Sequence, residues 1–289
     1  MHLKQSKKWG AYLQSLGWES FYIPQAIRIK KLLFWSVIKI QRPSKSPEGF
    51  FEKVDTLARA NKALFVKIEP GINEDENLLL RHGYLKSQDP LSPTKTIIID
   101  VKPAPDEMLK KFSKDTRQKI RCASVTEPNP ALTQIAKLDD LKKLEEFYKL
   151  FSQVASRKKF WKPSFAEIKK KAEAFKNSGF ISTLHLKKVP AATAMILIEE
   201  KSAYYEHAAC NSKIAEDFPY LLLWEVIKEC KKRRLDNLDL CGIFDERFSK
   251  ATSRWKKFSI FKKKWGGEEL AYPCPYIKYY NPLCKIFGF

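Results

Sequence analysis

AYYEHAACNSKIAEDFPYLLLWEVIKECKKRRLDNLDLCGI, residues 203–243, contains a predicted strand, a helix and a second strand in immediate succession. Small and aromatic residues fill the first strand, residues 202–209, and an apolar helix is predicted over residues 218–233. Residues 237–241 alternate leucine with polar side chains and end at Gly242, as a short strand does. This succession predicts a mixed domain of the α/β or α+β class.

Upstream of this stretch, predicted helices and strands continue to alternate. Apolar residues recur at helical or strand spacing, and proline and glycine mark the breaks between elements. The predicted strand at residues 192–199 is continuously apolar, which is typical of a central strand in a sheet. The predicted elements are helices at residues 106–124, 139–154 and 164–177, and strands at residues 94–101, 180–187 and 192–199.

The first part of the chain has a smaller version of the same rhythm. Strand-length apolar runs at residues 27–40 and 63–69 flank a predicted helix at residues 50–61, and another helix is expected over residues 73–82. The most apolar early stretch, residues 32–40, is too short to span a bilayer and contains a lysine. A length of 289 residues fits two domains of ordinary size.

The chain is strongly basic, with 54 Lys and Arg against 33 Asp and Glu and a formal net charge of +21. Such an excess favours an anionic partner, although a solubilising surface gives the same composition. The clearest cluster is RWKKFSIFKKK, residues 254–264, with six cations, no acid, and aromatic residues between them. This pattern suits phosphate contacts and base stacking, or equally an edge strand protected by lysines, with residues 258–262 as that strand.

Several functions are not supported by any motif. The sequence has no phosphate-binding P-loop, no G-x-S-x-G elbow and no H-E-x-x-H zinc motif. Its six cysteines are not spaced for zinc, so no metal and no disulfide framework are expected. Residues 1–10 lack the apolar segment of a signal peptide, and we expect a cytoplasmic protein.

The motifs together resemble the FemA/FemB/FemX family of peptidoglycan bridge-forming aminoacyltransferases. The segment QSKKWGAYLQSLGW near the start resembles that family's Gln-Ser…Trp-Gly signature, and TRQKIRCA at residues 116–123 its T-R-x-x-I-R-x-A helix end. FYKLFSQVASRKKFW resembles its helix that ends in arginine, residues 203–243 its strand–helix–strand segment, and FKKKWGG its F-K-x-x-[FW]-G-G ending. These matches occur in the family's order along almost the whole chain.

The resemblance implies two GNAT-type acyltransferase domains, the first one small. We expect the first at residues 1–93, with a C-terminal tail of residues 271–289 packing back on it, and the second at residues 94–270. It also implies transfer of an amino acid from aminoacyl-tRNA to the stem-peptide amine of a peptidoglycan precursor, either UDP-MurNAc-peptide or lipid II. We expect a monomer without a cofactor, and a peripheral contact with an anionic inner membrane face.

The resemblance also implies roles for particular residues. Phe261 and Lys262 match the F-K pair at the reacting ester, where a lysine can stabilise the oxyanion and the departing ribose oxygen. Arg157 matches a position suited to the acceptor's pyrophosphate. The other expected substrate contacts are Tyr205, His207 and Asp239, and the expected tRNA contacts are Arg254, Lys256, Lys257, Lys263 and Lys264.

Some features depart from the family's pattern, and two other functions stay open. Residues 11–13 occupy the stretch where relatives can place a phosphate-binding lysine, and Gln41-Arg42-Pro43 replaces a frequent G-P pair. An acyl-CoA N-acyltransferase would share the fold but needs a glycine-rich pyrophosphate loop, and residues 211–218 contain no glycine. A non-catalytic RNA-binding protein would also account for the charge.

Overall fold

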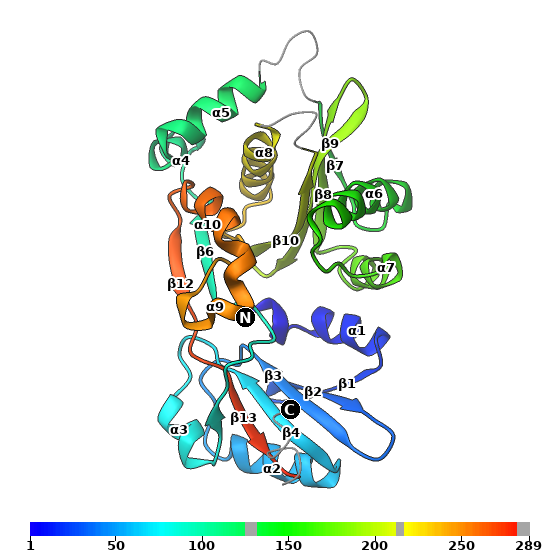
Figure 1. Cartoon of the computed structure of the whole chain (residues 1–289), viewed down its shortest axis with the longest axis vertical. Coiled ribbons are helices and arrows are strands. Elements are labelled where there is room, and N and C mark those ends of the chain that lie inside the picture. The colour runs from blue at the N-terminus through cyan, green and yellow to red at the C-terminus, as the bar shows by residue number, and fades with distance from the viewer. Residues whose placement is uncertain (125–131, 212–216, 282–289) are drawn as a thin grey trace. The chain divides into compact units, whose positions relative to one another are not determined.

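The computed structural model describes residues 1–124, 132–211 and 217–281, which form two compact units (Figure 1). Unit 1 contains Met1–Lys95, Phe244–Arg254 and the described part of Ala271–Phe289. Unit 2 contains Thr96–Ile243 and Trp255–Leu270. Each unit has a mixed α/β architecture built on one sheet, so the α/β class expected from the sequence is confirmed.

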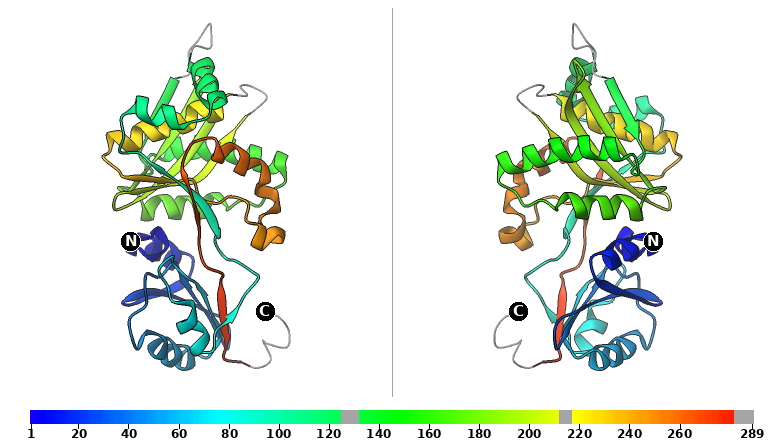
Figure 2. Two further views of the ribbon diagram at one scale, coloured as in Figure 1. Left: turned by 90° about the vertical axis from the view of Figure 1, so that its left-hand side faces the viewer. Right: turned by 90° about the vertical axis from the view of Figure 1, so that its right-hand side faces the viewer.

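Unit 1 is a six-stranded sheet in the order β1-β2-β3-β4-β13-β5. β1, β2 and β3 form an antiparallel meander, and β3 pairs in parallel with β4 across the intervening helix α2. β13, from the C-terminal segment, pairs with both β4 and β5 (Figure 2). Its elements are η1 (Leu3–Gln5), α1 (Lys7–Ser15), β1 (Trp18–Ile23), β2 (Gln25–Lys31), β3 (Ser36–Gln41), α2 (Phe50–Ala60), β4 (Ala63–Glu69), α3 (Glu76–Arg81), β5 (Leu85–Lys86), η2 (Glu246–Phe248), α9 (Ser249–Thr252) and β13 (Tyr276–Tyr279).

The core of unit 1 lies on one face of this sheet. Isoleucines and valines from β2, β3 and β4 point to that face because side chains alternate along each strand. They pack against the apolar stripe of α2, which includes Phe50, Phe51, Val54 and Ala58. The opposite side-chain positions of the same strands are largely polar, including Arg28, Lys39 and Lys67.

Unit 2 is a seven-stranded sheet in the order β12-β6-β11-β10-β9-β8-β7. β10 and β11 run parallel and are joined through α8, whereas β8, β9 and β10 form an antiparallel meander. Its elements are β6 (Lys95–Asp100), α4 (Pro105–Lys111), α5 (Lys114–Ser124), β7 (Leu132–Ala136), α6 (Leu141–Lys158), α7 (Phe165–Ala174), β8 (Gly179–Leu186), β9 (Val189–Glu199), β10 (Ser202–Cys210), α8 (Phe218–Lys232), β11 (Asn237–Asp239), α10 (Lys256–Lys263) and β12 (Glu268–Ala271), while η3 (Ser253–Trp255) lies where the chain passes from unit 1 to unit 2.

Two predicted elements are wrong in type or extent. Residues 258–262 lie in the helix α10 rather than in a strand, because Phe261 and Trp265 are spaced one helical turn apart and pack together against Tyr220. Residues 106–124 form two helices, because Phe112 takes an extended conformation and inserts between Trp224 and Trp265. Ser113 then accepts a hydrogen bond from the amide of Thr116 and starts α5.

Two further expectations differ from the structure in their bounds. The apolar run at residues 27–40 folds as the hairpin β2–β3 rather than as one strand. The segment Phe244–Arg254 groups with unit 1, although it lies inside the range expected for the second domain. Polar contacts of Asp245 and Arg247, described next, hold this segment in unit 1.

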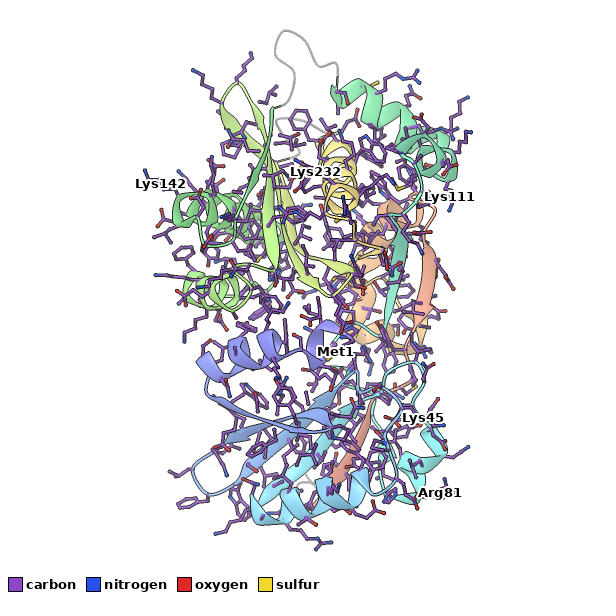
Figure 3. The ribbon with its side chains drawn as sticks, turned by 180° about the vertical axis from the view of Figure 1, so that it is seen from behind. Met1, Lys45, Arg81, Lys111, Lys142 and Lys232 are labelled. Carbon is purple, nitrogen blue, oxygen red and sulfur yellow. The ribbon has the colours of Figure 1, made fainter. Side chains whose placement is uncertain are left out.

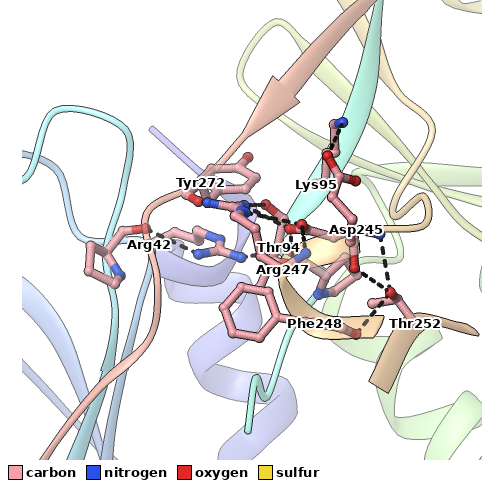
Figure 4. A network of polar contacts seen from close by, with 11 residues as sticks. Arg42, Thr94, Lys95, Asp245, Arg247, Phe248, Thr252 and Tyr272 are labelled. Atoms are coloured by element: carbon pink, nitrogen blue, oxygen red, sulfur yellow. Dashed lines mark hydrogen bonds and ion pairs between the residues drawn. The ribbon is translucent and has the colours of Figure 1, made fainter. Parts of the chain in front are cut away.

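Asp245 is the centre of a polar network in unit 1 (Figure 4). Its side chain is 1% exposed, and it accepts hydrogen bonds from Thr94 Oγ1 at 2.6 Å and from Arg247 Nη2 at 2.7 Å. Arg247 also donates to the carbonyl of Tyr272, whose own amide donates to the carbonyl of Thr94. Arg42 stacks over the Tyr272 ring at 3.8 Å. The network therefore joins segments beside three of the four points at which the chain passes between the units.

Replacing Asp245 by alanine should destabilise unit 1 by roughly 2–3 kcal/mol, because Thr94 and Arg247 lose a buried charged partner. Burial opposes ionisation of Asp245, but hydrogen bonds from Arg247 and Thr94 outweigh it and hold the pKa of the carboxyl below its ordinary value. The stabilisation is therefore present above the ordinary carboxyl pKa and is lost at lower pH. Urea unfolding of Asp245→Ala, of the exposed control Asp139→Ala and of wild type measures this. Equal midpoints for all three at pH 7 would contradict it.

Candidate functional site

Lys262 lies in the last turn of α10, with its ammonium held over a backbone turn in unit 2. Its Nζ donates to the carbonyl of Gly242 at 2.6 Å and to that of Cys241 at 3.3 Å. Both carbonyls belong to a chain reversal after β11, where Cys241 and Gly242 have φ values of 54° and 94°. Burial lowers the pKa of Lys262 to about 8, against the opposing effects of Cys241 and Asp239.

Asp239 supports this turn from inside the sheet. Its side chain is 7% exposed, accepts a hydrogen bond from Thr96 Oγ1 on β6, and accepts one from the amide of Cys241 at 2.7 Å. The amide of Gly242 in turn donates to Thr96 Oγ1. We call Thr96, Asp239, Cys241, Gly242 and Lys262 the Lys262 site. Within it, Asp239 fixes the turn that holds the ammonium.

Phe261, the other residue of the predicted catalytic pair, anchors α10 to the core of unit 2. Its ring contacts those of Tyr220 and Trp265, at centroid distances of 5.0 and 6.0 Å. The Trp265 side chain is fully buried. Gly266 follows in the left-handed region at φ 64°, and a Cβ there would meet the carbonyl oxygen of Lys111 at 2.3 Å. The F-K-x-x-W-G-G pattern is therefore the packing requirement of a helix that presents a lysine.

Tyr205 and His207 lie on β10, on either side of a bulge at Glu206. Register pairs Tyr204 with Asp239, so Tyr205 lies one residue beyond the end of the ladder with β11. Tyr205 packs against the core of unit 2. His207 Nε2 lies 3.2 Å from Lys171 Nζ, which donates to Glu206 at 2.6 Å. The His207 ring also packs on Phe151, so its described contacts are structural ones.

Arg157 lies in the last turn of α6, beside the far end of β10. Its Nη1 donates to the side-chain oxygen of Asn211 at 3.3 Å. Burial raises the pKa of the Cys210 thiol to about 11, opposed by the charges of Lys158 and Arg157. From Tyr204 to Cys210 the strand extends about 20 Å, since each strand residue advances roughly 3.3 Å. Arg157 and the Lys262 site are therefore associated with opposite ends of this segment of β10.

The five expected tRNA contacts do not form one uniform surface. Lys256 and Lys257 are exposed on α10, and Arg254 is exposed in unit 1. Lys263 is paired with Glu269, and Lys264 with Asp115, each at 2.6 Å. These two lysines thus meet carboxylates of their own unit, which reduces the charge that they present to a ligand.

Sequence reasoning missed a row of cations across the sheet of unit 1. Register places Arg28 on β2 beside Lys39 on β3, and Lys39 beside Lys67 on β4, so the three side chains share one face. Burial lowers the pKa of all three, that of Lys39 to about 8. Arg28 is 1% exposed, and its Nε and Nη1 have no hydrogen-bond partner among the described residues. The sequence signal for this row was a cation between two β-branched apolar residues in each of the three strands.

Thr96 and the Cys241–Gly242 turn were missed as well. Thr96 stands in the predicted strand at residues 94–101, but its role appears only when β6 pairs with β11 and brings it to Asp239. The turn uses backbone carbonyls and a left-handed cysteine, and cysteine is not a residue that signals this conformation. Among the described residues, no three His, Cys, Asp or Glu side chains gather as a metal site requires.

Residues 110–257 match the sequence profile described as the acetyltransferase (GNAT) domain. The match covers just over half of the chain, and the chain belongs to this family. A comparison with curated proteins gave no match. Within residues 1–124, 132–211 and 217–281, no helix combines the length and apolar character needed to span a membrane.

Solved structures extend the similarity to the whole fold. The crystal structure of FemX is similar over 100% of this chain and 95% of its own, with a TM-score of 0.80 and 16% identity. L-PGS from Bacillus licheniformis is similar over 94% of this chain and 88% of its own, with a TM-score of 0.63 and 16% identity. The C-terminal domain of a putative lysylphosphatidylglycerol synthetase from Agrobacterium fabrum is similar over 95% of this chain and 88% of its own, with a TM-score of 0.61 and 11% identity. The chain thus has the FemX-like GNAT fold expected from its motifs.

Lys262 should titrate with a midpoint near pH 8, because burial disfavours its charged form. The measurement is an NMR titration of protein labelled with ¹³C at the lysine Cε atoms. The Lys262 resonance is identified as the one missing from Lys262→Arg. A midpoint above about 10 would mean that the ammonium is fully hydrated and is not held over the turn.

Proposed function

We propose that this protein is an aminoacyltransferase that moves an amino acid from aminoacyl-tRNA to the stem-peptide amine of a peptidoglycan precursor. The Lys262 site carries the proposal, because Lys262 matches the family's F-K pair, two backbone carbonyls hold its ammonium, and its pKa is lowered to about 8. The full-length FemX-like fold supports it. The family of the chain, the GNAT domain, is one of acyl transfer to amines, and this agrees with the reaction class.

The chemistry that we propose is direct transfer. The acceptor amine nitrogen attacks the ester carbonyl carbon of the aminoacyl-tRNA, a C–N bond forms, and the C–O bond to the ribose breaks. The amine nitrogen loses one proton, and the ribose oxygen leaves and takes up a proton, so that the step is balanced. An ammonium has three N–H donors, and the contacts with the Gly242 and Cys241 carbonyls use two of them. The third can be offered to the oxyanion or to the leaving oxygen in a water-poor site, where such a bond is strongest.

Other cations in both units suit the binding of two anionic substrates. Arg157 is the residue that we propose for the acceptor's diphosphate, since a guanidinium binds two phosphate oxygens at once. The length of β10 between Arg157 and the Lys262 site is that of an extended acceptor rather than of a small molecule. The cation row of Arg28, Lys39 and Lys67 adds positive charge in unit 1. We propose that no cofactor is needed, since the aminoacyl ester is already activated.

Lys262→Ala should lower the turnover of aminoacyl transfer by about 100-fold or more with little change in substrate binding. Activity of the wild type should also fall above about pH 8, because the protonated form of Lys262 is the active one. Arginine keeps its charge at higher pH, so in Lys262→Arg the fall in activity should begin at a higher pH than in wild type. The assay follows radiolabelled amino acid from charged total tRNA into UDP-MurNAc-pentapeptide or its lipid-linked form.

Lys142→Ala, which removes an exposed lysine of α6 in the same unit, is the control for that assay. A loss below tenfold in Lys262→Ala would remove the proposed role of the ammonium. Transfer by the wild type to neither acceptor, with tRNA binding intact, would favour the RNA-binding alternative.

Lys256→Ala/Lys257→Ala should weaken binding of tRNA, and the slope of log affinity against log salt should fall by about 1.5 to 2. Both lysines are exposed on α10, and each is expected to neutralise one phosphate. Lys263→Ala/Lys264→Ala should have a smaller effect, because carboxylates already pair with these two. Fluorescence anisotropy with labelled tRNA measures both. An unchanged slope that matches the control Lys137→Ala/Lys142→Ala would place the tRNA elsewhere.

A second candidate function is acyl transfer from coenzyme A, and the GNAT family match favours it. Such a protein needs a pyrophosphate loop ahead of the helix after β10, and the sequence there, residues 211–218, has no glycine. A ligand that binds the native state must raise the melting temperature. We therefore expect no shift in Tm with coenzyme A or acetyl-coenzyme A, and a concentration-dependent rise would favour this second function.

A further inference from the structure

The turn between β2 and β3 presents four consecutive apolar side chains to solvent. The exposed fractions are 47% for Leu32, 88% for Leu33, 72% for Phe34 and 45% for Trp35. The amide of Leu32 donates to the carbonyl of Trp35 at 2.8 Å, which closes the turn. These residues, which we call the LLFW tip, form the free end of the β2–β3 hairpin of unit 1 (Figure 1).

The composition of this turn is opposite to that of an ordinary one. Hairpin turns favour Gly, Asn, Asp and Ser, because these residues tolerate the required backbone angles and are well hydrated. Single exposed apolar residues are normal on a protein surface, but a run of four at one protruding point is not. The hairpin itself needs no such residues, since Ile27, Ile29, Ile38 and Ile40 already fix its register from the core side. The tip is therefore suited to a partner.

Basic residues surround the tip. Lys30 and Lys31 precede it directly, and Lys62 lies beside its other end, where the amide of Ser36 donates to the Lys62 carbonyl at 3.2 Å. Lys30 and Lys31 donate to backbone or amide oxygens, to Leu16 and Asn61 respectively, so these two keep their charge unneutralised by the contact. The acid on the adjacent strand, Glu19, pairs with Ile29, two positions farther from the tip than Lys31.

We propose that the LLFW tip inserts into the interface of a bilayer that contains anionic lipids, with Lys30, Lys31 and Lys62 at its headgroups. A tryptophan, a phenylalanine and leucines are the side chains that partition into the boundary between headgroups and acyl chains. Lysines next to them are attracted by the negative surface potential of such a bilayer. A narrow protruding tip penetrates a fluid interface readily, whereas a protein partner would require a matching groove.

This inference is independent of the acyl transfer proposed above, because it rests on unit 1 and on no residue of the Lys262 site. The proposal predicts two contributions to membrane binding, an apolar one from the LLFW tip and an electrostatic one from the three lysines. The two can be removed one at a time, since both sets of side chains are exposed or bonded only through their ends.

The test is flotation of the purified full chain with vesicles of phosphatidylcholine, with or without 30% phosphatidylglycerol. Wild type should bind the anionic vesicles at least tenfold more strongly than Leu33→Ser/Phe34→Ser, and more strongly than it binds the neutral ones. Lys30→Gln/Lys31→Gln/Lys62→Gln should lose the preference for anionic lipid. The control Ile72→Ser/Leu80→Ser removes two other exposed apolar side chains of unit 1 and should bind as wild type does.

A second measurement does not depend on the folding of a serine variant. Brominated lipid quenches tryptophan at the depth of the bromine atoms, and Trp35→Phe should remove most of the quenching while preserving vesicle binding. Absence of vesicle binding, equal binding by the tip variant, or unchanged quenching in Trp35→Phe would each overturn the proposal. A dimer in solution that the tip substitutions convert to a monomer would assign the tip to self-association instead.

Discussion

Asp245 ties together chain segments that are far apart in the sequence and that continue directly into strand β6 and into the turn of the Lys262 site. Thr94 stands two residues before Thr96, and Asp245 stands three residues after Gly242. The hydrogen bond from Thr94 to Asp245 therefore joins the two chain segments that lead to the Lys262 site. The amide of Leu240 donates to the carbonyl of Ile97 and continues the same pairing inside unit 2. A buried carboxylate with a neutral and a charged donor supplies this closure at a single point.

The sequence predicted the main course of the fold, because its core strands and helices carry strong periodicity. The antiparallel meander, the helix α8 and the strand β11 were all visible in residues 180–241. The nature of α10 was not, since RWKKFSIFKKK has the alternation of a strand and the cation content of either element. Burial of Phe261 and Trp265 beside Tyr220 decided for the helix, and that partner lies about forty residues earlier in the chain.

The candidate site was predictable only in part, for a similar reason. Lys262 could be named from a motif, but the two carbonyls that hold its ammonium have no signature in side-chain chemistry. Asp239 could be placed on a strand, yet its partner Thr96 comes from a strand that is antiparallel to β11 and remote in sequence. Contacts made by backbone atoms and by strand neighbours are properties of the folded sheet, and a single sequence does not encode them as a local pattern.

Net charge was an incomplete guide to which lysines serve a function. Exposed basic side chains occur on both units, among them Lys45, Arg81, Lys111 and Lys142 (Figure 3). By contrast, burial lowers the pKa of Lys39 and that of Lys262 to about 8. Lys263 and Lys264 are neighbours of Lys262 in sequence but are engaged by carboxylates. Burial and contact with carboxylates therefore distinguish lysines that look alike in the sequence.

Strand β13 has a consequence for the synthesis of the protein. It pairs with β4, and Lys278 bonds Asp55 across a sequence separation of 223 residues. At roughly 5 to 20 residues per second, a ribosome needs on the order of 10 to 45 s to cover that separation. During this interval the edge of β4 has no strand to pair with, although most of unit 1 has already been made. Unit 1 is thus begun before unit 2 and completed after it, and the nascent chain spends this period with an open sheet edge that can pair with other chains.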